Sequence, residues 1–164
     1  MRKIYCYSHS EFDNKCYESG WNDFNLPEDK AFISITGTKE CQDYYLGEKE
    51  DHWFSNTSES EKILNLEFDD ISDNIFIWKG HKFTGITKEQ ARKVIDFIEL
   101  NLDCDFYIHC RAGKSRSQGI VRFILDMYPN YFEQGRPENP CTSPNYFVVS
   151  QLKRAYYEKN SIWE

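Results

Sequence analysis

The stretch DFYIHCRAGKSRSQG, residues 105–119, constrains the fold more than any other part of the sequence. A short apolar run at 106–109 ends in a His-Cys pair, a loop with one glycine follows, and a largely apolar segment begins at Arg116. The short run is typical of a strand, and the longer segment is typical of a buried helix. A strand joined to a helix by so tight a loop favours an α/β protein.

The rest of the chain also alternates between strand and helix patterns. Strands are predicted at 2–7, 31–36 and 63–68, and helices are predicted after Ser8 or Ser10 toward Gly20, from Thr87, and from Pro144 in a first helical turn. Residues 39–62 are predicted to be mainly loop, and residues 75–83 to be an extra loop or strand. The order predicts one domain over residues 1–164, with a central, mostly parallel sheet and helices on both faces.

The charge balance argues against some classes of partner. The formal net charge is −7 and the sequence pI is about 5.2, whereas bulk nucleic-acid binding depends on cations that neutralise many phosphates. No apolar run approaches the roughly 20 residues that a membrane span needs. The first residues, MRKIYCYSHSEF, lack the apolar region of a signal peptide. We therefore expect a cytoplasmic protein without a membrane span.

The six cysteines and four histidines do not follow a metal-binding pattern. No CxxC pair occurs and the histidines are scattered, whereas structural zinc needs closely spaced ligand pairs. We expect no metal site, and most cysteines are predicted to be small buried hydrophobic residues. A disulfide between Cys104 and Cys110 is disfavoured because both would lie along one strand, so that another cysteine would be the better partner.

The loop between the strand and the helix favours an anion site. Successive backbone N–H groups in such a loop point inward, and the helix N-terminus adds its partial positive charge. Cys110 would lie at the floor, where the same field favours its thiolate, and Arg116 would grip two phosphate oxygens. A thiolate facing a bound phosphate is an arrangement for nucleophilic displacement. Ser117 would then donate a hydrogen bond to the sulfur, and His109 would orient the loop.

The sequence HCRAGKSRS, residues 109–117, resembles the His-Cys-x5-Arg-Ser/Thr signature of the cysteine-based protein tyrosine phosphatases. The late position of the loop looks most like the dual-specificity branch, and like small bacterial and phage-encoded members in particular. The resemblance implies the cysteine-phosphatase fold and a phosphate monoester hydrolase that forms a phosphocysteine intermediate without metal or cofactor. The implied catalytic residues are Cys110, Arg116, Asp70 and Ser117, and the implied substrate-binding residues are His109, Arg111, Ala112, Gly113, Lys114 and Ser115.

The resemblance also implies a general acid on a loop upstream of the cysteine, which protonates the leaving oxygen and then acts as a base toward water. Matching hydrophobic positions assigns this role to Asp70, with Asp69 as the second candidate and Asp73 as the third. The alternative for each is a carboxylate in a solvated turn. The separation of these aspartates from Cys110 is longer than in typical members, because residues 75–83 intervene.

Phosphotyrosine in a protein or peptide, with or without phosphoserine and phosphothreonine, is the leading predicted substrate. Arg111 and Lys114 favour an alternative, a polyphosphorylated small molecule or RNA 5′ end such as a phosphoinositide, an inositol phosphate or a nucleotide, since two basic side chains suit several phosphates. The plainer interpretation is that both point to solvent or pair with the acidic loop at 69–73.

Other functional classes fit the motif less well. A non-catalytic phosphate-binding module would keep the loop but lack an acid, whereas cysteine, arginine and aspartates are all present. AGKS hints at a nucleotide P-loop, but that pattern needs a glycine where Ile108 stands. A rhodanese-like sulfurtransferase or an arsenate reductase shares the loop idea, and the latter usually carries its loop near the N-terminus.

Overall fold

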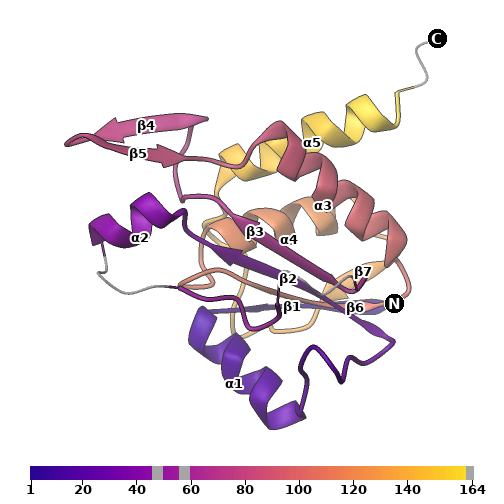
Figure 1. Cartoon of the computed structure of the whole chain (residues 1–164). Coiled ribbons are helices and arrows are strands. Elements are labelled where there is room, and N and C mark those ends of the chain that lie inside the picture. The colour runs from indigo at the N-terminus through magenta and orange to yellow at the C-terminus, as the bar shows by residue number, and fades with distance from the viewer. Residues whose placement is uncertain (46–49, 56–59, 162–164) are drawn as a thin grey trace.

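The computed structural model describes residues 1–45, 50–55 and 60–161, and its centre is a five-stranded parallel sheet (Figure 1). The strand order is β3-β2-β6-β1-β7. The strands of this sheet are β1 (Arg2–Tyr7), β2 (Lys30–Thr36), β3 (Ile63–Glu67), β6 (Asp105–His109) and β7 (Phe132–Gln134). Two further strands, β4 (Ile75–Trp78) and β5 (His81–Thr84), form a separate antiparallel hairpin.

Helices cover both faces of the sheet, as Figure 1 shows. Helix α1 (His9–Ser19) lies on one face, whereas α3 (Lys88–Leu100), α4 (Arg116–Met127) and α5 (Tyr146–Lys159) lie on the other. The short helix α2 (Lys39–Tyr45) packs against the hairpin. The predicted α/β architecture is therefore confirmed, and the main sheet is wholly rather than mostly parallel.

The alternation of side chains along the central strands builds a different core on each face. Phe32 of β2 is in register with Tyr107 of β6, and both belong to an aromatic cluster on the α1 side. The next pair along, Ile33 and Ile108, faces the larger aliphatic cluster under α3, α4 and α5. Burying each such side chain contributes roughly 1.5–3 kcal/mol. The central strands are therefore held from both sides, as parallel strands require.

Local capping signals set the start of two helices. Ser8, and not Ser10, is the N-cap of α1, where it exchanges hydrogen bonds with Glu11 in a capping box. Thr87 and Gln90 make the same exchange at the start of α3. Each box satisfies two backbone N–H groups that a helix otherwise leaves without partners. The predicted starts of both helices are confirmed.

Three local expectations were incomplete or wrong. Residues 39–45, predicted as loop, form α2, which is too polar to show a clear period and is held by packing against β5. Part of the predicted loop, 46–49 and 56–59, lies outside the described residues. Pro144 lies before the N-cap Asn145 rather than in the first turn of α5. Strand β7 was not predicted because its three residues carry too short an apolar pattern.

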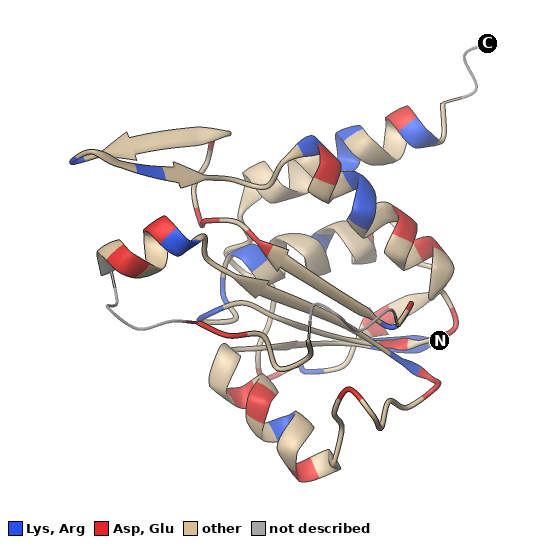
Figure 2. Ribbon diagram, viewed as in Figure 1, with Lys and Arg blue, Asp and Glu red and all other residues tan. Residues whose placement is uncertain are grey.

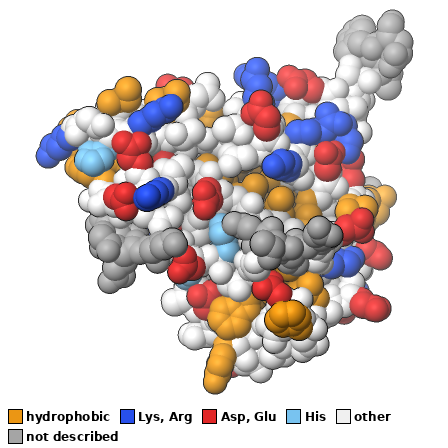
Figure 3. All heavy atoms as spheres, in the orientation of Figure 1, with side chains coloured by type: hydrophobic (Ala, Val, Ile, Leu, Met, Phe, Trp, Pro, Cys, Tyr) orange, Lys and Arg blue, Asp and Glu red, His pale blue; other side chains and the backbone are white. Residues whose placement is uncertain are grey.

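Residues 75–83 form most of the β4–β5 hairpin, which resolves the choice between a loop and a strand. The hairpin projects from the body of the protein, and every residue of β4 is exposed. Figure 3 shows hydrophobic and basic side chains together on this projection, at the upper left. Ile77, for example, is 67% exposed.

The distribution of charge follows the layers. In Figure 2 the charged residues lie mainly on helices, loops and strand ends, with both signs interspersed, and the middles of β2, β3 and β6 are uncharged. Among the described residues, none of the helices is both long and apolar enough to cross a bilayer.

Helices α4 and α5 meet so closely at Gly119 that a side chain there should destabilise the fold. A Cβ atom would lie 2.9 Å from the carbonyl O of Asn145 and 2.9 Å from Cβ of Val148. We expect Gly119→Ala to lower the free energy of unfolding by about 1–3 kcal/mol through overpacking, which outweighs a gain of about 1 kcal/mol in helix propensity. Urea unfolding measures this. Ser150→Ala on the exposed face of α5 is the control, and a stability equal to wild type in Gly119→Ala would contradict the expectation.

Candidate active site

The carboxyl ends of the parallel strands bring the predicted site residues to one edge of the sheet. Cys110 directly follows β6, the middle strand, and Asp69 and Asp70 follow β3 two strands away. Between them, β2 ends at Thr36 and leads into Gly37. This edge is where open α/β sheets bind ligands.

The loop from Cys110 to Arg116 is shaped by donors that hold its carbonyl groups outward. The carbonyl O of Arg111 accepts a hydrogen bond from the N–H of His9 at 3.0 Å. The carbonyl O of Gly113 accepts from Nδ2 of Asn139 at 3.1 Å and from Nε2 of Gln118 at 3.2 Å. In a trans peptide the N–H points opposite to the C=O. The N–H groups that follow these two carbonyls are therefore directed to the inside of the loop.

Gly113 is required by both conformation and space. Its φ is 69°, in the left-handed region that favours glycine. A Cβ atom there would lie 2.7 Å from the carbonyl carbon of Tyr7 and 2.8 Å from the N of Ser8. The loop therefore rests directly on the backbone at the end of β1.

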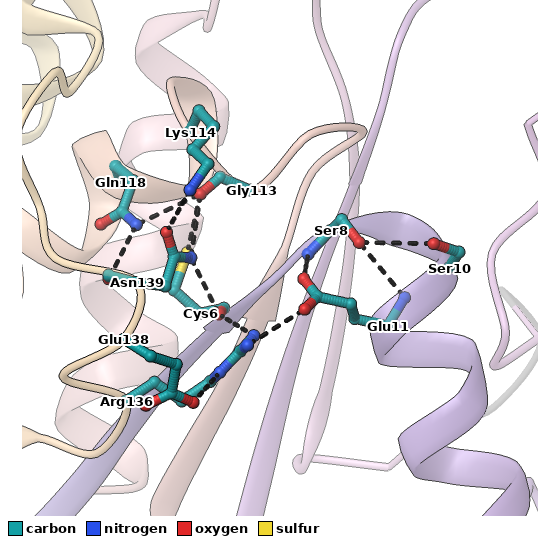
Figure 4. Close-up of polar contacts among 10 residues, drawn as sticks. All are labelled: Cys6, Ser8, Ser10, Glu11, Gly113, Lys114, Gln118, Arg136, Glu138 and Asn139. Carbon is teal, nitrogen blue, oxygen red and sulfur yellow. Dashed lines mark hydrogen bonds and ion pairs between the residues drawn. The ribbon is translucent and has the colours of Figure 1, made fainter.

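A second layer of polar side chains supports the loop from behind, as Figure 4 shows. Asn139, 5% exposed, donates to the carbonyl O of both Cys6 and Gly113 and accepts from Nζ of Lys114 at 2.8 Å. Arg136 also donates to the Cys6 carbonyl and bonds Glu11, whose pKa it lowers to about 2. The loop after β7 thereby ties residues 110–116 to β1 and α1. Residues 110–116 are called the phosphate loop below, after the family signature that they resemble.

The sulfur of Cys110 lies at the floor of the site, 2% exposed. Oγ of Ser117 is 3.0 Å from this sulfur and 3.2 Å from Sγ of Cys6, which donates to it. Burial raises the pKa of the Cys6 thiol to about 12, so Cys6 stays protonated at neutral pH. Because a hydroxyl has one hydrogen, accepting from Cys6 leaves Ser117 free to donate that hydrogen to Cys110.

Arg116 begins α4 and is 8% exposed. Its Nη1 donates to the carbonyl O of Phe68 at 2.9 Å, which fixes the guanidinium at the end of β3. One donor is used in this bond, and the planar fork retains others for a ligand. The first turn of α4 carries no acidic residue, and Ser115 at its N-cap makes no side-chain capping bond. The positive end of this helix is therefore left open to an anion.

His109 is completely buried and neutral. Burial, assisted by the nearby His9, lowers its pKa to about 3. Its Nδ1 lies 3.3 Å from the carbonyl O of Cys110, and its Nε2 lies 2.7 Å from Oγ of Ser34, which also contacts Nδ1 of His52 at 2.7 Å. A neutral ring that donates from Nδ1 accepts at Nε2. His109 therefore lies behind the loop and holds the Cys110 carbonyl rather than reaching a substrate.

The two adjacent aspartates after β3 occupy different environments. Asp69 is 2% exposed, and its carboxylate accepts from the N–H and hydroxyl of Thr38 and from the N–H of Thr84, at 2.8–2.9 Å. Asp70 is exposed and accepts from Oγ of Ser115 at 2.7 Å. Asp69 therefore connects the turn before α2 to the end of β5, whereas Asp70 directly contacts the phosphate loop. Asp73 is exposed and bonds the adjacent Asn74 N–H.

The two extra basic residues of the loop have partners other than the predicted acidic loop. Nη1 of Arg111 is 3.3 Å from Oε1 of Glu50, and Lys114 bonds Asn139. Both residues are exposed, which agrees with the first half of the plainer interpretation, whereas their partners lie outside residues 69–73, which contradicts its second half. Ala112 and Lys114 are exposed.

A cavity of about 580 Å³ lies at this edge of the sheet, between the end of β3 and the hairpin. One side is polar, with Arg116, Asp70 and the Arg111–Glu50 pair. The other side is apolar and includes Phe76 and Phe83 of the hairpin. The cavity thus joins a polar, charged side to an aromatic wall.

Several residues of this edge were not found by sequence reasoning. They are Cys6, Glu50, Gln118, Asn139 and Asn145. An asparagine or serine before a periodic run signals a helix cap, so Asn145 was detectable as a cap. Its contact with the acidic loop, and the reach of Asn139 across to β1, depend on long-range packing that no local pattern encodes.

Comparison with known proteins gives similarity in structure only. No family model matches the chain, and no curated protein matches its sequence. The crystal structure of Tk-PTP in its active form is similar, with 14% identity, coverage of 98% of this chain and 82% of that one, and a TM-score of 0.41. The crystal structure of PTPMT1 in complex with PI(5)P is also similar, with 10% identity, coverage of 97% of each chain and a TM-score of 0.43.

Reversing the hydrogen-bonding sense of Asn139 should disturb the phosphate loop. Asn139→Asp keeps an acceptor for Lys114 but presents a carboxylate oxygen to the carbonyls of Cys6 and Gly113. Each carbonyl would lose one of its donors and face a carboxylate oxygen instead, and such a loss of buried hydrogen bonds costs about 1–3 kcal/mol. We expect a stability loss of that size and weaker protection by inorganic phosphate in thermal unfolding. Glu138→Gln, which changes only the exposed partner of Arg136 in the same loop, is the control. Unchanged phosphate protection in Asn139→Asp would contradict this account.

The depressed pKa of His109 gives stability a specific pH dependence. The unfolded chain protonates this histidine below about pH 6.5, whereas the folded protein does so only near pH 3. The contribution of neutral His109 is therefore complete above pH 6.5 and is lost as the pH falls toward 3, by at most about 1.4 kcal/mol per pH unit. Urea unfolding between pH 7 and pH 4 should show a shallower slope in His109→Asn than in wild type. Equal slopes would contradict the prediction.

Proposed function

We propose that this protein hydrolyses phosphate monoesters through a phosphocysteine intermediate. Cys110 is the nucleophile, Arg116 and the loop N–H groups bind the phosphoryl oxygens, and Asp70 is the general acid and base. The observation that carries the proposal is that Cys110 begins a loop whose amides face inward, and that this loop ends at an open helix N-terminus where Arg116 lines a cavity. The reaction class is phosphate monoester hydrolysis of the tyrosine or dual-specificity phosphatase type.

The first step forms the S–P bond and breaks the bond between phosphorus and the ester oxygen. The electron pair of the broken bond stays on the leaving oxygen, which takes the proton of Asp70. Arg116 and the amides stabilise the charge on the equatorial oxygens throughout.

The second step returns the enzyme to its starting state. A water molecule attacks phosphorus, the Asp70 carboxylate takes a water proton, and the S–P bond breaks with its electrons on sulfur. Ser117, 3.0 Å away, donates to the departing thiolate. The products are the alcohol or phenol from the first step and inorganic phosphate, so the atoms balance without a metal or redox partner.

The contacts of the aspartates support Asp70 as the acid. Both line the cavity with Arg116, but Asp69 is almost fully buried and is engaged by three donors from Thr38 and Thr84. Asp70 is exposed, and its second carboxylate oxygen is the more available to a leaving oxygen. This availability of an acid also favours an enzyme over a non-catalytic phosphate-binding module.

The cavity favours a phosphotyrosine side chain as the substrate. Phe76 and Phe83 provide an apolar wall beside the phosphate floor, which suits an aromatic ring. A polyphosphorylated substrate would need further cations, but Arg111 is paired with Glu50 and Lys114 is bonded to Asn139. Because both basic side chains already have partners within the protein, a polyphosphorylated substrate is the weaker alternative.

Hydrolysis of para-nitrophenyl phosphate between about pH 5 and 8, with EDTA present, tests the mechanism. We expect Cys110→Ser and Arg116→Lys to abolish turnover, because they remove the nucleophile and the planar phosphate clamp. Asp70→Asn should reduce kcat by about 10²-fold or more on phenyl phosphate, whose leaving oxygen needs a proton, and by much less on para-nitrophenyl phosphate. Asp73→Asn on the same loop is the matched control. Full activity in Cys110→Ser would refute the phosphocysteine step.

The same proteins separate the rival functions when they are given a panel of phosphopeptides, inositol phosphates and nucleotides. Preference for phosphotyrosine peptides would support the proposed substrate. Preference for inositol phosphates or nucleotides, lost selectively in Arg111→Ala with Lys114→Ala, would overturn it. An inert wild type whose Cys110→Ser variant still binds phosphate would indicate the binding module.

A further inference from the structure

Asp70 stands between two cavities and is held by donors on one of its carboxylate oxygens. It lines the cavity above Arg116 and also a second cavity of about 600 Å³, which Ser115 and Asn145 line as well. Its Oδ1 accepts from Oγ of Ser115 at 2.7 Å and from Nδ2 of Asn145 at 2.8 Å. Within residues 1–45, 50–55 and 60–161, we find no donor to its Oδ2.

Asn145 is fixed in its own orientation by the helix that it begins. Its Oδ1 accepts from the N–H of Val148 at 3.1 Å, which caps α5, so the other end of the amide must be the donor. That Nδ2 also donates to the carbonyl O of Ile71 at 3.1 Å. The backbone N–H of Asn145 donates to the carbonyl O of Ser115 at 3.0 Å. Asn145 thus connects three parts of the chain, which are the loop at 69–73 (the acid loop), the phosphate loop and the start of α5.

The hydroxyl of Ser115 is free to act on Asp70. Ser115 is the N-cap of α4, but its side chain makes no capping hydrogen bond to that helix. It bonds the carboxylate of Asp70 instead. The phosphate loop therefore holds the acid loop directly.

We propose that Asn145 and Ser115 are positioning residues that hold Asp70 through Oδ1, so that Oδ2 carries the proton exchanged with the substrate. This inference rests on the proposed function. Two N–H or O–H groups already point at Oδ1, so the acidic proton resides on Oδ2. In the first step that proton passes to the leaving oxygen, and in the second step a water proton returns to Oδ2. Oδ1 keeps both donors throughout.

The exposure of Asp70 explains why such positioning is needed. A carboxylate on an exposed turn is free to rotate away, and a misplaced catalytic group loses much of its effect. Nothing else in the described residues bonds its side chain. Ser115 and Asn145 therefore hold the exposed carboxylate of Asp70 in place, whereas the carboxylate of Asp69 is held by its burial and its own donors.

Aryl phosphates with different leaving groups test the proposal. A nitrophenolate leaves readily without a proton, whereas phenolate needs the acid, so loss of acid positioning should affect phenyl phosphate selectively. We expect Asn145→Ser and Ser115→Ala each to lower kcat on phenyl phosphate by about 10-fold, a part of the 10²–10⁴-fold that a general acid supplies. On para-nitrophenyl phosphate we expect less than about 3-fold, because the acid contributes less there. Inhibition by inorganic phosphate should be unchanged in Asn145→Ser.

The variants keep the test independent of folding. Serine is as good an N-cap as asparagine, so Asn145→Ser retains the cap of α5. If Asn145→Ser does not fold, Ser115→Ala alone tests the positioning role. Ser150→Ala, which alters the rim of the second cavity without touching Asp70, is the matched control. Equal losses on both substrates, or no loss on either, would overturn the positioning role.

Asp70→Asn separates this inference from the proposed function. Suppose that Asp70→Asn selectively loses activity on phenyl phosphate while Asn145→Ser and Ser115→Ala do not. In that case only the positioning role fails. If Asp70→Asn shows no selectivity, Asp70 is not the acid and that part of the proposed function fails with it.

Discussion

The orientation of the peptide groups between Cys110 and Arg116 is the constraint on which the rest of the site depends. Amide N–H groups attract an anion only when their carbonyls are turned away, and a carbonyl turned away inside a protein needs a donor. The His9 N–H at the start of α1 supplies one, and the amides of Gln118 and Asn139 supply the others. The loop is therefore held open by three separate parts of the chain before any ligand arrives, which lowers the cost of binding one.

Most of the polar groups around the sulfur of Cys110 are neutral, so they act on it as hydrogen-bond donors and dipoles rather than as charges. Burial keeps the Cys6 thiol protonated and the His109 ring uncharged. Each then acts as an oriented hydrogen-bond partner, Cys6 through Ser117 and His109 through the carbonyl of Cys110. The positive charge at the floor comes from Arg116 and from the N-terminus of α4. In the proposed mechanism a thiolate and a bound phosphate would meet these fixed dipoles and one planar cation, because the buried carboxylate of Asp69 is already engaged by Thr38 and Thr84.

The sequence allowed the architecture and the phosphate loop to be predicted because both depend on local patterns. Apolar runs, the capping boxes at Ser8 and Thr87 and the left-handed glycine of the loop, Gly113, are encoded within a few residues. The distinction between Asp69 and Asp70 depends on which loop reaches each carboxylate, and adjacent residues carry no local signal of that. Helix α2 escaped prediction for a similar reason, since its packing against β5 and not its composition stabilises it. The catalytic roles of Cys110, Arg116, Asp70 and Ser117 stay predictions.

The close approach of α4 and α5 links the fold to the chemistry. Any side chain at Gly119 would push against the carbonyl of Asn145, the residue that begins α5. Moving that turn by even a few tenths of an ångström would lengthen the 2.8 Å contact between Asn145 and Asp70, because the cap and the contact share one amide. Gly119, which has no side chain of its own, therefore helps to set how near Asp70, the proposed acid, lies to the phosphate loop. The position of Asp70 thus depends on helix packing, and a substitution at Asp70 alone would leave that packing unchanged.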